Sequence, residues 1–172
     1  MTNLYFRKFH SDDFDHYFSL VSNESVMAMI TERAIPLEEA HTNYKKILEL
    51  NKKHELFGTY KVSTTDNVFL GLGRLILNEE NTVEAELGYM LLPEFWGNSY
   101  GSKIADYFIE QARNTALTRL TAIIDPNNIP SRKILTNRGF ISEKLCEIDG
   151  LPGEILSKAL SDSITDKVNG NR

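Results

Sequence analysis

Residues 85–112 read AELGYMLLPEFWGNSYGSKIADYFIEQA, and the local structure of this stretch decides the fold. Apolar residues occupy every second position from 83 to 91, and this period of two is typical of a β-strand. Glycines then mark a turn at 96–101, after which apolar residues recur at helical spacing through 102–113. The stretch therefore predicts a strand over 82–92, a turn and a helix over 102–113.

The turn before the predicted helix is suited to an anion. A helix start presents unpaired backbone N–H groups at the positive end of the helix dipole, and this arrangement binds phosphate. Gly97 and Gly101 let the backbone approach an anion closely, while Ser99 and Ser102 add hydroxyl donors. Plain turn geometry is the alternative explanation. The sequence contains neither G-x-x-x-x-G-K-[ST] nor G-x-G-x-x-G, the two common phosphate loops.

Strand and helix signals alternate on both sides of this stretch, so we expect an α/β chain. The further predicted strands are 4–9, 56–63, 67–77, 119–124, 140–149 and 153–159. The further predicted helices are 11–21, with Ser11 as its N-cap, 23–29, 36–52, and a short one capped by Asn128 that ends at Gly139.

The composition favours one globular domain. The chain has 172 residues, 41% hydrophobic and 25% charged, with a net charge of −5. We expect the domain to span 1–160 and the polar stretch 161–172 to be a flexible tail. No basic run suggests nucleic acid as a partner, and no apolar run approaches the roughly 18 residues of a membrane span.

Cys146 is the only cysteine, so an internal disulfide is excluded and a reducing cytoplasm is the expected location. His10, Asp12, Asp13 and His16 resemble a metal cluster, but a helix N-terminus accounts for the two acidic residues more simply. We therefore expect no metal.

Several motifs, in order along residues 4–160, resemble the GNAT acyltransferases, and most closely the branch of ribosomal-protein N-terminal acetyltransferases. They are Glu86-Leu87-Gly88-Tyr89, Pro93-Glu94-Phe95-Trp96-Gly97, Tyr100-Gly101-Ser102, Asn128-x-x-Ser131 and Gly139-Phe140. The resemblance implies an α/β (α+β) fold in which helices flank a mixed, mostly antiparallel central sheet. That sheet splays apart between the strands predicted at 82–92 and 119–124.

The resemblance also implies acetyl-CoA as cosubstrate, held between the two splayed strands. A strand bulge would free backbone groups at Met90, Leu91 and Leu92 for the pantetheine arm, and Asn128 would bond the pantetheine or the region near the thioester. The pyrophosphate would rest on the main chain of Gly97, Asn98, Ser99, Tyr100, Gly101 and Ser102. The sequence departs from the family pattern at Ser99, where a glycine is usual, and at Leu135, where many relatives carry a general-acid tyrosine.

Two side chains are candidates for proton transfer. Glu86 could serve as general base, directly or through a water, or it could be a solvent-facing strand carboxylate like Glu84. Ser131 could protonate the leaving thiolate, or its hydroxyl could simply satisfy the first turn of its helix. The N–H near Leu91 is the candidate oxyanion donor. Arg132 and Lys133 could meet the nucleotide 3′-phosphate, or they could be exposed helix charges.

The predicted activity is direct transfer of an acetyl group from acetyl-CoA to a primary amine, since no activated nucleophile is visible. By resemblance, the acceptor is the α-amine of a protein N-terminus. The alternatives are a small amine, such as an amino acid, a polyamine or an aminoglycoside, and a non-catalytic acyl-CoA-binding regulatory domain. If the chain associates with itself, we expect a homodimer.

Overall fold

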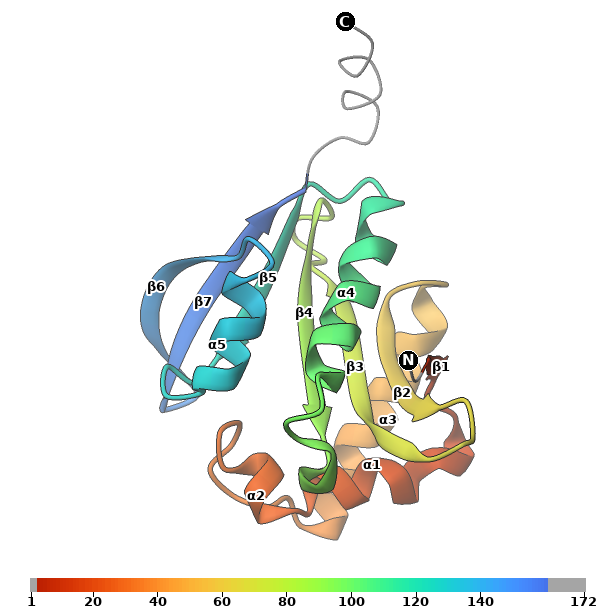
Figure 1. Cartoon of the computed structure of the whole chain (residues 1–172). Helices are drawn as coiled ribbons and strands as arrows, with labels where there is room; N and C mark the ends of the chain where they lie inside the picture. The colour runs from red at the N-terminus through yellow and green to blue at the C-terminus, as the bar shows by residue number, and fades with distance from the viewer. Residues whose placement is uncertain (1–2, 161–172) are drawn as a thin grey trace, which may run out of the picture.

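Seven strands form one sheet in the order β1-β2-β3-β4-β5-β7-β6 in the computed structural model, which describes residues 3–160 (Figure 1). The strands are β1 Leu4–Lys8, β2 Gly58–Thr64, β3 Phe69–Leu77, β4 Glu84–Leu91, β5 Arg119–Ile124, β6 Ile141–Ile148 and β7 Leu151–Ala159. Every neighbouring pair is antiparallel except β4 and β5, which are parallel. The mixed, mostly antiparallel sheet expected from the sequence is confirmed.

Five α-helices connect the strands within residues 3–160. They are α1 Phe14–Val21, α2 Glu24–Met27, α3 Leu37–Lys53, α4 Tyr100–Arg113 and α5 Ile129–Thr136, with 3-10 turns at Ser11–Asp13 and Pro93–Phe95. Asn128 caps α5 as predicted, because its side chain accepts a hydrogen bond from Ser131 N. The predicted cap at Ser11 is wrong: the helical turn starts one residue earlier, with His10 at the cap position.

Asp13 accounts for that shift. Its buried carboxylate accepts a hydrogen bond from His10 N (2.9 Å) and forms ion pairs with Arg7 (2.9 Å) and Lys61 (3.0 Å). Burial acts to raise the pKa of Asp13, but the His10 bond and the two cations outweigh burial and lower it. Asp13 is therefore a structural anchor between β1, β2 and the first helix.

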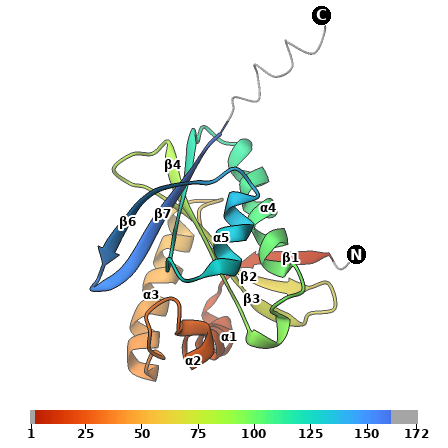
Figure 2. The ribbon, with the colours of Figure 1, turned by 60° about the vertical axis from the view of Figure 1, so that its left-hand side comes forward.

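The helices cover the two faces of the sheet in two groups. Helices α1 and α3 pack on β3 and β2, and α2 packs on α1. Helix α4 packs on β4 and β3, and α5 packs on α4. Figure 2 shows α1, α2 and α3 gathered together, away from α4 and α5. Each group encloses its own apolar core, one around Phe108 and one around Tyr44.

The sheet opens between β4 and β5. Their pairing is confined to Glu84–Glu86 against 119–121, whereas β5 pairs with β7 along its whole length, from Arg119↔Ala159 to Ile124↔Glu154. Strand β4 meanwhile stays in register with β3 as far as Gly71↔Leu91. Because each strand follows a different neighbour, they diverge beyond Glu86 and leave a V-shaped opening.

The bulge expected around Met90–Leu92 does not appear as a register shift. The pairing of β3 with β4 is continuous from Gly71↔Leu91 to Leu77↔Ala85, and Leu92 N goes on to donate to Leu70 O. The second half of β4 has an open edge because β5 turns away from it. The backbone groups at the end of β4 are therefore left free by the departure of β5, and not by a bulge.

The predicted tail, residues 161–172, lies outside the described residues, so the division at residue 160 stays a prediction. Within residues 3–160, no helix has the length and apolar character needed to cross a bilayer.

Candidate active site

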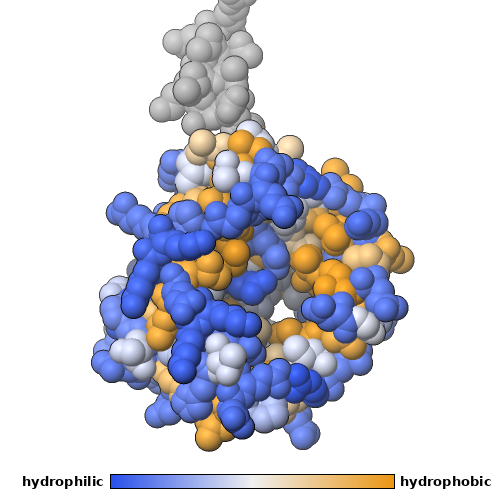
Figure 3. Space-filling view, turned by 180° about the vertical axis from the view of Figure 1, so that it is seen from behind, coloured by the Kyte–Doolittle hydropathy of each residue, from blue (hydrophilic) through white to orange (hydrophobic). Residues whose placement is uncertain are grey.

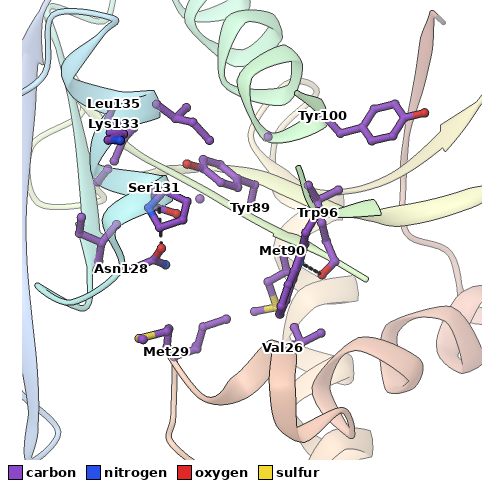
Figure 4. Close-up of a pocket in the computed structure, with 18 of the residues that line it drawn as sticks. Val26, Met29, Tyr89, Met90, Trp96, Tyr100, Asn128, Ser131, Lys133 and Leu135 are labelled. Carbon is purple, nitrogen blue, oxygen red and sulfur yellow. Dashed lines mark hydrogen bonds between the residues drawn. The ribbon is translucent and has the colours of Figure 1, made fainter. Parts of the chain in front are cut away.

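A cavity of about 570 Å³ occupies the opening between β4 and β5. This volume is in the range of small-molecule sites. Its walls come from β4, β5, the turn between β4 and α4, the start of α5, and the segment around α2. Figure 4 shows side chains of the segment around α2, of β4, of the turn into α4 and of α5 around one space, so residues far apart in the sequence meet here.

The turn into α4 supplies unpaired main-chain donors. Among residues 3–160, no acceptor is within hydrogen-bond reach of the backbone N–H groups of 97–102. Gly97 and Ser99 have positive φ angles of 77° and 64°, which curl the chain just before a helix of 14 residues. Curled backbone at a helix N-terminus concentrates N–H dipoles on one point, and an anion is the natural ligand there.

Ser99 explains one departure from the family pattern. Its φ of 64° lies in the left-handed region, where glycine is favoured and other residues are strained by roughly 1 kcal/mol. The turn keeps the glycine-like conformation in spite of the serine. Ser99, Gly97, Tyr100 and Gly101 line the cavity, whereas Asn98 and Ser102 do not.

Helix α4 begins at Tyr100, two residues before the predicted start, and the second residue of the helix is buried against β4 and α5. A Cβ atom on Gly101 would lie 3.1 Å from Ile134 Cδ1 and 3.4 Å from Tyr89 Cε2. The absent side chain therefore lets the first turn of α4 lie close to both elements.

Asn128 and Ser131 line the opposite wall, at the start of α5. The Asn128 side chain accepts a hydrogen bond from Ser131 N (3.3 Å), which orients the first turn of the helix. The Ser131 hydroxyl faces the cavity from this wall, and Leu135 lies one turn further along the helix (Figure 4). The structure thus brings Ser131 and Asn128 together with the α4 turn, as the sequence predicted.

Tyr89 is the site residue that the sequence reasoning missed. Its ring crosses the cavity and its hydroxyl points toward Ser131 (Figure 4), yet the buried oxygen has no hydrogen-bond partner among the described residues. Burial raises the pKa of Tyr89, and the nearby Ser131 hydroxyl and Arg138 partly offset that effect. The available signal was its place on the apolar face of β4, beyond the point where β5 diverges.

Glu86 lies outside the set of residues that line the cavity. Its carboxylate forms an ion pair with Arg74 Nη2 (2.7 Å), and the Arg74 side chain lies over Gly88, in the space that the missing Gly88 side chain leaves. Glu84, on the same face of β4, is held in the same manner by Arg119 (2.6 Å). The base role of Glu86 stays a prediction.

The end of β4 reaches the cavity in part. Met90 and Leu91 line it and Leu92 does not. The carbonyl oxygen of Leu91 accepts a hydrogen bond from the indole of Trp96 (2.9 Å), so that group already has a protein partner. Trp96 is held beside the open edge of β4 by this bond (Figure 4).

The two basic residues of α5 diverge. Lys133 lines the cavity. Arg132 forms an ion pair with the fully buried Glu154 of β7 (2.5 Å) and donates to Pro126 O (3.1 Å). The Arg132 guanidinium therefore already has protein partners in this structure, and a role for Lys133 at the nucleotide 3′-phosphate stays a prediction.

No group of three or more His, Cys, Asp or Glu side chains placed to hold a metal ion occurs within residues 3–160. The polar groups that line the cavity are main-chain amides, the hydroxyls of five Ser and Tyr side chains, the side-chain amides of Asn127 and Asn128, and the ammonium group of Lys133. This set binds a phosphorylated ligand and assists proton transfer.

Comparison with known proteins agrees with this geometry. Residues 3–141 match the family described as the acetyltransferase (GNAT) domain. The uncharacterized N-acetyltransferase p20 of Bacillus licheniformis is 33% identical over 85 residues, which cover 49% of this chain and 47% of that protein. The chain thus aligns with about half the length of this curated relative.

Solved structures share the fold at low sequence identity. The spermidine N-acetyltransferase of Vibrio cholerae, in complex with CoA and spermine, superposes with a TM-score of 0.77 at 16% identity, covering 94% of this chain and 98% of that one. RimL, a ribosomal L7/L12 alpha-N-protein acetyltransferase in complex with CoA, also gives 0.77 at 16% identity, covering 95% and 97%.

The family match spans most of the described residues, and the opening, the α4 turn and the start of α5 lie where the resemblance placed them. The chain belongs to the GNAT family of acetyltransferases, enzymes that take their acetyl group from acetyl-CoA.

Proposed function

We propose that the chain transfers the acetyl group of acetyl-CoA directly to the α-amine of a protein N-terminus. The observation that carries the proposal is the array of unpaired N–H groups at 97–102, four residues of which line the cavity between β4 and β5. RimL, which has the same fold, is an acetyltransferase of protein α-amines. A small amine is the second candidate, since a spermidine acetyltransferase also shares the fold.

Each wall of the cavity has a part in this proposal. The main chain of 97–101 would hold the pyrophosphate, and Lys133 would stand near the remaining phosphate. The open edge of β4 at Met90 and Leu91 would guide the pantetheine arm toward Asn128. The N–H near Leu91 is the candidate donor to the thioester oxygen, where negative charge develops during attack by the amine.

Ser131 is the candidate donor of a proton to the departing thiolate. The Tyr89 hydroxyl beside it stays protonated through neutral pH, because burial raises its pKa. A protonated phenol that donates to the Ser131 oxygen would leave the serine proton free for the sulfur. The Tyr89–Ser131 pair would thus supply the proton-donating hydroxyl that many relatives place on a tyrosine at the position of Leu135.

Glu86 is the candidate base and would act through a water, because its carboxylate lies outside the cavity and is paired with Arg74. We expect Glu86→Gln to lower kcat at least tenfold at pH 7, with the loss shrinking toward pH 9 as the free amine becomes abundant. Glu84→Gln is the matched control, since Glu84 shares the face and the ion-paired state of Glu86. Equal rates for the two variants from pH 6 to 9 would remove Glu86 from the mechanism.

The proposed function is tested by thiol release from acetyl-CoA in the presence of short peptides with a free α-amine, with N-acetylated peptides as the control. We expect turnover only with the free amine. A non-catalytic acyl-CoA-binding domain would gain thermal stability with CoA and release no thiol, and that result would refute the proposal.

A cytoplasmic location follows from the proposal, since acetyl-CoA and nascent protein N-termini meet there, and the lone Cys146 is consistent with it. A homodimer stays a prediction.

A further inference from the structure

The cavity has two halves, one on each face of the sheet. Tyr89, Gly101 and Ser131 belong to the half beneath α4 and α5. The other half, called here the acceptor half, is formed by five side chains: Val26, Met29, Ile30, Met90 and Ile123. Figure 4 shows the three of them that it labels, Val26, Met29 and Met90, on the side of the cavity away from Tyr100.

Sheet geometry places these residues on one face. Met90 packs against the core of α1, α2 and α3, which also contains Val26. Strand β5 runs parallel to β4 with Glu86 opposite Thr121, so Ile123 lies on the face of Glu86 and Met90. In the proposed function, the α4 turn binds the phosphates on the opposite face of the sheet. The acceptor half is therefore the side from which an amine would approach the thioester.

The acceptor half leaves large apolar side chains exposed to water. Met29 is 43% exposed, Ile30 40% and Ile123 43%, whereas Val26 beneath them is 6% exposed. Seen from behind, the molecule is hollowed near its centre, and hydrophobic surface borders the hollow (Figure 3). Exposed apolar side chains gathered around a concave site indicate a ligand that covers them.

The charges around the cavity also disfavour an acceptor with several ammonium groups. Among the described residues that line the cavity, Lys133 is the only charged one, and it stands on α5. The Arg74–Glu86 ion pair adjoins the acceptor half at Gly88, where the two charges neutralise each other. A polyamine or an aminoglycoside would bring several ammonium groups to a surface that offers no carboxylate of its own, and unpaired cations are costly against apolar walls.

We propose that the acceptor is the α-amine of a peptide chain whose first residue carries an apolar side chain of the size of leucine or methionine. The side chain would cover Met29, Ile30 and Ile123, and the uncharged amine would face the thioester. This inference rests on the proposed function and specifies its substrate class.

The test compares kcat/KM for pentapeptides that differ only in their first residue, with leucine, methionine, serine or aspartate there. Burial of a leucine side chain in place of a serine predicts a 10- to 100-fold preference for the leucine and methionine peptides. Spermidine and isoamylamine complete the panel. Isoamylamine carries the leucine side chain without a peptide, so it distinguishes a small apolar amine from a peptide N-terminus.

A variant pair locates the preference. Met29→Asp is expected to lower kcat/KM for the leucine peptide at least tenfold and to raise it for spermidine. Leu145→Asp is the matched control, because Leu145 is a 69% exposed apolar residue on β6, outside the cavity. Trp96 is the only tryptophan and lines the cavity, so its fluorescence reports peptide binding to the CoA-bound protein without turnover.

The possible outcomes distinguish failure of the acceptor class from failure of the proposed acetyl transfer. A tenfold or greater preference for the apolar peptides that Met29→Asp removes and Leu145→Asp keeps would support the inference. Turnover of the serine or aspartate peptide, spermidine or isoamylamine at an equal or higher kcat/KM would overturn the acceptor class and leave acetyl transfer intact. CoA binding without thiol release for any amine would refute the proposed function, and the acceptor class with it.

Discussion

The Gly101→Val variant is expected to bind CoA at least tenfold more weakly than the unmodified protein. A single Cβ at this position would already lie 3.1 Å from Ile134 Cδ1 and 3.4 Å from Tyr89 Cε2. The two further methyl groups of valine overpack this contact, so the first turn of α4 has to move away from β4 and α5. The N–H groups of 97–102 then no longer point toward one bound anion. Titration with CoA, followed by Trp96 fluorescence or calorimetry, measures the loss.

Ala112→Val is the matched control for this effect. Ala112 is fully buried near the other end of the same helix, so the substitution overpacks α4 far from the turn. It should lower the free energy of unfolding while CoA affinity stays within about twofold. A folded Gly101→Val variant with unchanged affinity would mean that the phosphates bind elsewhere.

Arg132→Met is expected to lower the free energy of unfolding by about 3–5 kcal/mol, the usual cost of removing one partner of a buried ion pair. Glu154 is 0% exposed, and its one ion pair among the described residues is with Arg132. Neither carboxylate oxygen accepts a hydrogen bond from a described residue. Loss of the guanidinium therefore leaves a buried carboxylate without charge compensation. Denaturant unfolding at pH 7 measures the change.

Two further variants test whether this loss of stability comes from the uncompensated carboxylate of Glu154. Glu154→Gln should cost less than Arg132→Met, because Arg132 is partly exposed and keeps its bond to Pro126 O. The double variant should recover part of the loss, since it contains no stranded charge. A larger cost for Glu154→Gln would show that the carboxylate is stabilised by groups other than Arg132.

The parts of the fold that the sequence predicts are those that local physics decides. The alternation along 82–92 places Ala85 and Leu87 in the core beneath α4, as observed. Asn128 caps α5, and the two strands predicted at 140–149 and 153–159 form a hairpin that turns through Asp149-Gly150, with φ angles of 52° and 81°. In each case the deciding interactions lie within a few residues of one another.

The parts that the sequence does not predict depend on strand register and packing. No local signal pairs Arg74 with Glu86 or Arg132 with Glu154, because each pair joins different elements of the fold. The Tyr89 hydroxyl points toward Ser131 only because β5 diverges from β4 and the start of α5 forms the opposite wall of the cavity. The expected bulge in β4 was wrong for a related reason: a strand edge can open through loss of a neighbour as well as through an extra residue.

The most direct measurement is a crystal structure of the protein with CoA bound. We predict that the pyrophosphate oxygens lie within hydrogen-bond distance of the N–H groups of 97–101. The pantetheine arm should lie between β4 and β5, with its sulfur near Ser131. Density for the pyrophosphate away from the α4 turn, or a sulfur outside the opening, would contradict this prediction.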